Sequence, residues 1–64
     1  MNPESKKQAR KYMSMSVEDF RDPKTGEVNH TELAEDTANE LNLYEDTVDY
    51  KIPDWVFEMA AEFN

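Results

Sequence analysis

The chain has 64 residues, no cysteine, and 15 acidic against 7 basic residues, which gives a formal net charge of −8. A chain of this length forms one domain, residues 1–64, and without cysteine it holds neither disulfide bonds nor thiolate metal sites. No apolar run approaches the roughly 18 residues of a membrane span, and no apolar signal segment follows the basic N-terminal residues. We therefore expect a small acidic protein of the cytoplasm.

The first apolar pattern predicts a helix over residues 3–21. Pro3 suits the first helical position. Apolar residues recur along one helical face at Ala9, Tyr12, Met13, Val17 and Phe20. Ser16 with Asp19 resembles a capping box that would restart the helix, but the apolar face crosses Ser16 unbroken and favours one continuous helix. The helix ends before Pro23, because a residue that precedes proline avoids the α region.

The second predicted helix covers residues 30–43. Asn29 is a good N-cap, and Glu32, three residues later, completes a capping box. The apolar face consists of Leu33, Ala34, Thr37, Ala38, Leu41 and Tyr44. Acidic side chains occupy the opposite side, so this helix is expected to bury one face and expose the other.

The third predicted helix covers residues 53–63 and begins at Pro53. Its apolar face consists of Trp55, Val56, Met59, Ala60 and Phe63. Residues 48–52 alternate between apolar and polar side chains, which indicates a short extended segment that could pair with Val28. Together the three apolar faces predict an all-α fold, a small three-helix bundle. The expected centre of the bundle is Phe20, Leu33, Leu41, Trp55 and Phe63.

The residue types argue against an enzyme. Nucleophilic catalysis needs a nucleophile beside a base, but the chain has no cysteine and its single histidine, His30, stands in the first turn of a helix. A single glycine, Gly26, cannot build a glycine-rich phosphate loop. We expect no catalytic residue, no metal ligand and no cofactor.

Residues 21–32 resemble an EF-hand loop. Gly26 stands at loop position 6, Val28 at position 8, Asn29 at position 9 and Glu32 at position 12, with a helix expected on each side. The resemblance implies a cation site, but Arg21 stands at the first ligand position. The same residues also fit a simple turn and a capped helix, so the loop is expected to be free of metal.

Residues 31–36 look like the opening of a helix-turn-helix motif. Ala38 stands where the turn glycine of that motif is expected, and the segment that would read DNA is acidic. Because DNA binding depends on neutralising phosphates with cations, the charge argues against a nucleic-acid partner.

Charge is divided unevenly along the chain. Four of the seven basic residues lie between Lys6 and Lys11, whereas fourteen of the fifteen acidic residues follow Met15. Cations near the start of a helix oppose its macrodipole, so this basic segment needs a compensating partner. In an up-down-up bundle we expect that partner to be Glu40, Glu45, Asp46, Asp49 and Asp54. An external partner for the basic segment is the alternative.

Two apolar residues lie off the helical faces: Met15 in the first helix and Phe57 in the third. Because methionine and aromatic side chains are enriched at interfaces, we predict contacts through Phe57, Met15 and the acidic side of the third helix, which carries Asp54, Glu58 and Glu62. The predicted function is a non-enzymatic protein–protein interaction or regulatory module, with a protein partner or self-association as a homodimer. The alternatives are an inhibitor that mimics nucleic acid in a basic groove, and an EF-hand-like metal-binding domain.

Overall fold

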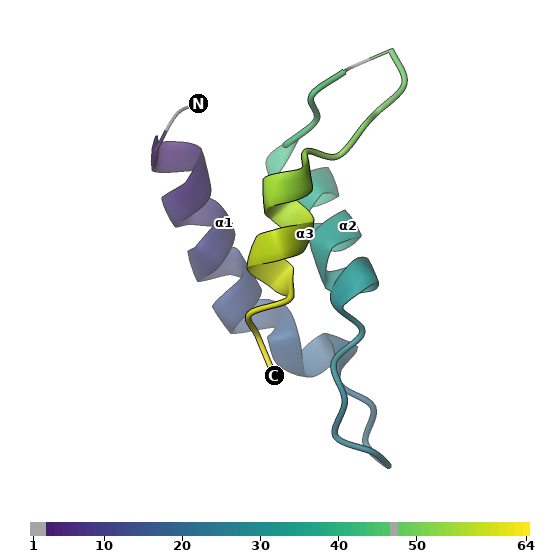
Figure 1. Ribbon diagram of the computed structural model, residues 1–64. Helices are drawn as coiled ribbons and strands as arrows, with labels where there is room; N and C mark the ends of the chain where they lie inside the picture. The colour runs from purple at the N-terminus through teal and green to yellow at the C-terminus, as the bar shows by residue number, and fades with distance from the viewer. Residues whose placement is uncertain (1–2, 47) are drawn as a thin grey trace.

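A computed structural model describes residues 3–46 and 48–64. The chain forms α1 (Pro3–Ser16), the short 3-10 helix η1 (Val17–Phe20), α2 (His30–Leu41) and α3 (Asp54–Ala60). Successive helices run in opposite directions, and α1 and α2 each lie against α3 (Figure 1). The predicted all-α three-helix bundle is confirmed. None of the helices in the described residues has both the length and the apolar character that a bilayer crossing requires.

The sequence pattern favours a first helix that continues through Ser16, and this prediction is wrong. The α-helix ends there, and the Ser16 side chain makes no capping hydrogen bond to the η1 turn that follows. Arg21 leaves η1 with extended backbone angles, and its N–H donates to the carbonyl of Glu18 (3.3 Å). A single turn of 3-10 helix preserves the apolar spacing almost as well as an α turn, so periodicity does not distinguish the two.

The predicted cap of α2 is confirmed, because the Asn29 side chain accepts a hydrogen bond from the backbone N–H of Glu32 (3.1 Å). The other half of the predicted capping box is wrong, because the Asn29 N–H donates to the carbonyl of Phe20 (2.8 Å) and not to the Glu32 side chain. The helix ends at Leu41, two residues before the predicted end. Asn42 adopts the left-handed conformation (φ 55°), and the Leu43 N–H donates to the carbonyl of Ala38 (2.9 Å). These are the features of a Schellman-type C-cap, in which asparagine replaces the usual glycine.

The third helix is shorter than predicted. Pro53 is its N-cap, with extended angles, and the regular helix stops at Ala60. Tighter hydrogen bonds replace the α pattern beyond that point, from the Glu62 N–H to Met59 and from the Phe63 N–H to Ala60. This irregular end places the last residues of the chain beside the start of α2, where the His30 Nε2 bonds to the carbonyl of Phe63 (2.5 Å).

The extended segments pair locally rather than with each other. Arg21 forms an antiparallel bridge with Val28, and Asp46 forms one with Lys51. The predicted pairing of Val28 with residues 48–52 is therefore wrong. Each bridge closes a short loop next to it in the sequence, which costs less chain entropy than joining two distant loops.

Alanine and longer aliphatic residues, rather than aromatic ones, form the centre of the bundle. The buried apolar residues are Ala9, Met13, Val28, Leu33, Ala34, Ala38, Val56, Met59 and Ala60. Of the five residues expected at the centre, only Leu33 is fully buried; the others pack partly buried against this cluster. Four of these nine buried residues are alanines, and the large rings remain at the rim. The buried hydroxyl of Thr37 donates to the carbonyl of Leu33 (2.7 Å).

A polar contact joins α1 to α2 beside this cluster. The hydroxyl of Tyr12 donates to Asp36 Oδ2 at 2.5 Å. This hydrogen bond, assisted by partial burial, raises the pKa of Tyr12 above its ordinary value of 10.0. Ionisation of the phenol would remove the donated proton and place two negative charges side by side.

We expect Leu33→Ala to destabilise the fold by about 2–5 kcal/mol, because it removes a fully buried side chain from a small core. A domain of this size has a total stability of only about 3–10 kcal/mol. The matched control is Met15→Ala, because Met15 is 73% exposed and should change stability by less than about 0.5 kcal/mol. Urea denaturation followed by circular dichroism measures both. Equal losses in the two variants would contradict the assigned core.

We expect the bond between Tyr12 and Asp36 to contribute about 0.5–1.5 kcal/mol. Since the folded pKa of Tyr12 is raised, this contribution is present below the ordinary tyrosine pKa and is lost as pH rises through the folded value. The difference in melting temperature between the wild type and Tyr12→Phe should therefore shrink in alkali. Tyr50→Phe, at an exposed ring, is the control, and its difference from the wild type should not follow this trend.

Candidate functional site

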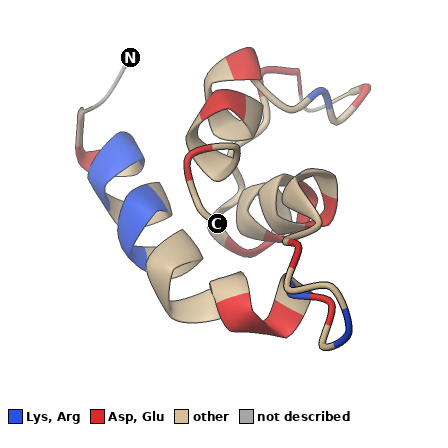
Figure 2. Cartoon of the chain, turned by 60° about the horizontal axis from the view of Figure 1, so that its bottom comes forward, with Lys and Arg blue, Asp and Glu red and all other residues tan. Residues whose placement is uncertain are grey.

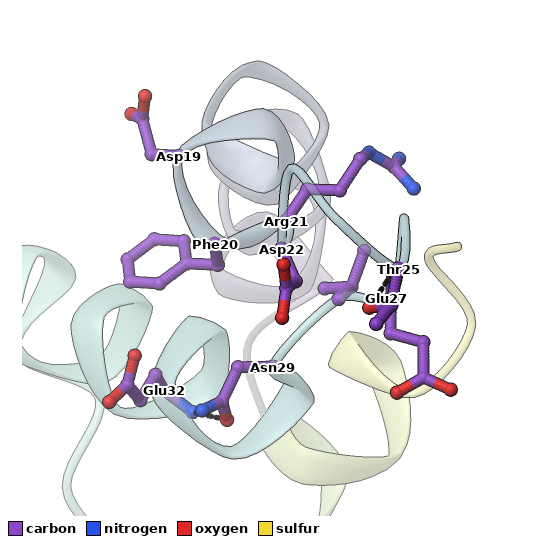
Figure 3. A pocket seen from close by; sticks show the side chains of 9 residues that line it. Asp19, Phe20, Arg21, Asp22, Thr25, Glu27, Asn29 and Glu32 are labelled. Carbon is purple, nitrogen blue, oxygen red and sulfur yellow. Dashed lines mark hydrogen bonds between the residues drawn. The ribbon is translucent and has the colours of Figure 1, made fainter.

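A surface hollow of about 510 Å³ lies where η1, the turn after it and the start of α2 meet. Its lining consists of Asp19, Phe20, Arg21, Asp22, Thr25, Glu27, Val28, Asn29 and Glu32. Figure 3 shows the Arg21 side chain directed away from Phe20 and Glu32. The exposed lining is mainly polar and acidic.

A second hollow of about 490 Å³ continues along the outer side of α2 toward the loop before α3. It is lined by Phe20, Glu32, Glu35, Asp36, Asn39, Tyr44, Tyr50 and Ile52. Both hollows include Phe20 and Glu32, so they adjoin. We call the two together the acidic groove. Its lining on α2 follows the i, i+3, i+4, i+7 spacing, which spans about 10 Å of helix.

Carboxylates dominate the electrostatics of the acidic groove. Its acidic lining residues are Asp19, Asp22, Glu27, Glu32, Glu35 and Asp36, and its basic lining is Arg21 alone. Within the described residues, none of these six carboxylates forms an ion pair. Figure 2 shows most of the basic segments gathered on α1, away from this acidic stretch. The groove therefore carries an excess of negative charge that the described residues do not neutralise.

The guanidinium of Arg21 is engaged outside the groove. It binds both carboxylate oxygens of Glu18, with the closest contact at 2.8 Å, and donates to the carbonyls of Gly26 (2.8 Å) and Asn64 (2.7 Å). The hydrogen bonds lower the pKa of Glu18 below its ordinary value and raise the pKa of Arg21. Arg21 thus joins η1, the turn and the end of the chain.

Aromatic rings form the far end of the groove. The rings of Tyr44 and Tyr50 meet edge to face, with centroids 5.3 Å apart and planes at 85°. Tyr50 remains 66% exposed and has a left-handed backbone (φ 52°), a conformation that costs an L-residue roughly 1–2 kcal/mol. Two backbone hydrogen bonds help to hold this loop: the Glu45 N–H donates to the carbonyl of Lys51 (2.7 Å), and the Lys51 N–H donates to the carbonyl of Asp46 (3.2 Å).

The segment that resembles an EF-hand loop closes as a turn. The Asp22 N–H donates to the carbonyl of Glu27 (2.7 Å), and the Gly26 N–H donates to the carbonyl of Asp22 (2.8 Å). Gly26 has a positive φ of 78°, as its place in the turn suggested. Among the described residues no group of three or more histidine or acidic side chains is placed to hold a metal ion. The Gly26 carbonyl instead accepts from the guanidinium of Arg21.

Two further motifs take ordinary structural places. Ala38, at the position where a helix-turn-helix motif would turn, is buried inside continuous α2. The ring of His30 is half-buried and bonded to the Phe63 carbonyl, so it helps to hold the end of the chain against α2. Neither arrangement contains a nucleophile paired with a base.

The interface residues predicted from the sequence lie elsewhere than in the acidic groove. Met15 is 73% exposed at the end of α1, and Phe57 is 37% exposed on α3. Asp54, Glu58 and Glu62 are exposed on α3 and just beyond its end. Their exposure agrees with the off-face positions seen in the sequence, whereas a partner at these residues remains a prediction.

The expected partners of the basic segment are wrong. Arg10 forms an ion pair with Glu62 (3.4 Å), and the Lys6 ammonium lies 5.7 Å from the centre of the Trp55 ring. Within the described residues, no ion pair joins the basic segment to a carboxylate of residues 40–54. At these two points the basic segment contacts Trp55 of α3 and Glu62 just beyond its end, which were not among the expected partners.

The sequence pattern does not reveal the acidic groove, because it assigns one part of the groove's residues to the core and the other part to the solvated surface. Phe20 was assigned to the centre of the bundle, while Glu32, Glu35 and Asp36 were assigned to the solvated side of the second helix. A usable signal was the clustering of these three carboxylates at helical spacing, followed by two tyrosines. Their convergence on Phe20 depends on how η1 packs against α2.

No protein family model matches the chain, and neither the curated proteins nor the solved structures include a significant match to it.

We expect millimolar calcium to leave both the Trp55 fluorescence and the melting temperature unchanged, because Arg21 occupies the first ligand position and binds the Gly26 carbonyl. The matched variant is Glu32→Gln, which removes the carboxylate at the twelfth loop position. A saturable calcium response that magnesium does not reproduce and Glu32→Gln abolishes would contradict this expectation.

Proposed function

We propose that the chain is a non-catalytic protein-interaction module of the cytoplasm, and that its acidic groove receives a basic segment of a partner protein. The observation that carries the proposal is the junction of the two hollows at Phe20 and Glu32, within a lining of carboxylates that form no ion pair in the described residues. Carboxylates bind lysine and arginine side chains, and aromatic rings add favourable contacts to their cationic heads and stems.

The groove also supports the choice of a protein over nucleic acid as the partner. Six carboxylates repel a phosphate backbone, whereas exposed tyrosines beside a charged rim are typical of protein interfaces. An inhibitor that mimics nucleic acid would use the same acidic surface against a basic groove. The two functions differ in the partner, since the partner of such an inhibitor would be a protein that binds nucleic acid.

A second candidate is the interface on α3 predicted from the sequence. The observation that favours it is the exposure of Phe57 among Asp54, Glu58 and Glu62. Self-association through this face would bury the exposed ring in a homodimer. The pair of Arg10 with Glu62 neutralises part of the face, which leaves it a weaker attractant for basic partners than the acidic groove.

The test is the affinity for a synthetic peptide in which arginine alternates with apolar residues, measured by calorimetry at physiological ionic strength. We expect Glu35→Lys to weaken binding roughly three- to tenfold, because charge reversal replaces an attraction of up to about 1 kcal/mol by repulsion. The matched control is Glu58→Lys, which makes the same change in net charge on α3 and should alter affinity less than about twofold.

The outcomes separate the two candidates. A loss confined to Glu58→Lys and Phe57→Ala would move the interface to α3. Equal losses in Glu35→Lys and Glu58→Lys would show that only net charge attracts the peptide, and would contradict a specific groove. Sedimentation at several protein concentrations tests the homodimer, which Phe57→Ala should dissociate if α3 is its interface.

A further inference from the structure

A third hollow, of about 660 Å³, lies on the oppositely charged side of the molecule. It is lined by Lys7, Arg10, Lys11 and Ser14 of α1 together with Phe63. The four α1 residues follow the i, i+3, i+4, i+7 spacing of one helical face. We call these five residues the basic stripe. It shares no lining residue with the acidic groove, so the two surfaces can act independently.

The positive charge of the basic stripe is only partly matched within the molecule. Arg10 reaches Glu62 at 3.4 Å, but both side chains are more than half exposed, so solvent weakens this pair. Among the described residues, no carboxylate lies within ion-pair distance of Lys7 or Lys11. Lys7 and Lys11 also stand four residues apart on α1, where like charges repel each other. An external anion would relieve this repulsion.

The apolar part of the stripe is held in place. Phe63 packs half-buried against the core, its N–H donates to the carbonyl of Ala60 (3.2 Å), and its carbonyl bonds to His30. The next residue, Asn64, is tied through its carbonyl to Arg21 (2.7 Å). These bonds fix the ring beside the cations of α1, so a ligand would meet a preformed surface.

We infer that the basic stripe binds an acidic peptide segment of another protein, one that carries an apolar side chain beside its carboxylates. The carboxylates pair with Lys7 and Lys11, and the apolar side chain packs on Phe63. The ligand class follows from the combination of three cations with the Phe63 ring, since a purely ionic ligand would leave the exposed part of this ring uncovered.

The charge of the rest of the chain argues against two other anionic ligands, a nucleic acid and a second copy of this chain. A nucleic acid carries closely spaced phosphates over many ångströms, so phosphates beyond the stripe would meet the part of the chain after Met15, which carries fourteen carboxylates. A second copy of this chain supplies acidic segments, but each copy carries a net charge of −8, which weakens the docking of one copy's acidic surface on the stripe of another. A short acidic segment meets less repulsion than either of these ligands, because its carboxylates lie only against the stripe.

The experiment measures fluorescence anisotropy of two labelled peptides that differ at one position. Both contain four glutamates; the first carries a central leucine and the second carries serine in its place. We expect the leucine peptide to bind at physiological ionic strength, and the serine peptide to bind at least threefold more weakly. This comparison tests the contact with the Phe63 ring without altering the protein. Equal binding of the two peptides, or none, overturns the inference.

Charge reversal in the protein locates the binding site. We expect Lys11→Glu to weaken the affinity for the leucine peptide about tenfold. The matched control is Lys24→Glu, at an exposed lysine in the turn after η1, and it should change this affinity less than twofold. Circular dichroism establishes that both variants fold, and Lys7→Glu replaces Lys11→Glu if the latter does not. Equal losses in the stripe variant and the control overturn the inference.

The same protein samples test the excluded occupants. Tighter binding of labelled duplex DNA than of the leucine peptide, lost in Lys11→Glu, would show that the stripe serves nucleic acid and would overturn the inference. Concentration-dependent self-association that Lys11→Glu abolishes would assign the stripe to a second copy, with the same consequence. A monomer that binds the leucine peptide and not DNA supports the inference.

Discussion

The small buried core that the three helices share is the constraint on which the rest of the structure depends. Ala9, Ala34, Ala38 and Ala60 are fully buried together with Met13, Leu33 and Val56, whereas none of the aromatic side chains in the described residues is buried at the centre. Those rings still pack against the core, but each keeps part of its surface in solvent. The acidic groove and the basic stripe therefore each include one phenylalanine ring, since Phe20 and Phe63 stand partly buried at the edge of the core.

The distribution of charge gives the two edges opposite characters. Phe20 lies among carboxylates from η1, the turn and α2, whereas Phe63 lies beside the cations of α1. Arg21 could have reduced this contrast, but its donors are used by Glu18 and by the carbonyls of Gly26 and Asn64. The bundle therefore separates an acidic groove from a basic stripe within a single small domain, and each surface combines charge with an aromatic ring.

Much of the fold could be predicted because it depends on local rules. The cap at Asn29, the positive φ of Gly26 and the apolar faces of the three helices follow from residue type and spacing. The 3-10 turn after Ser16 could not be predicted, because one turn of either helix satisfies the same spacing. Of the candidate site, the exposure of Phe57 was predictable from its off-face position, but the acidic groove was not, since it joins side chains from separate elements.

By itself the sequence determined the fold class, the number of helices and the separation of basic from acidic segments, because these depend on composition and on neighbours along the chain. Only the tertiary structure decided which opposite charges meet. The basic segment faces α3 rather than the loop at residues 42–52, and the carboxylates of α2 converge with those of the η1 turn. The physical reason is that charge pairing depends on distances of a few ångströms between elements, which the packing of the core sets and which no local pattern records.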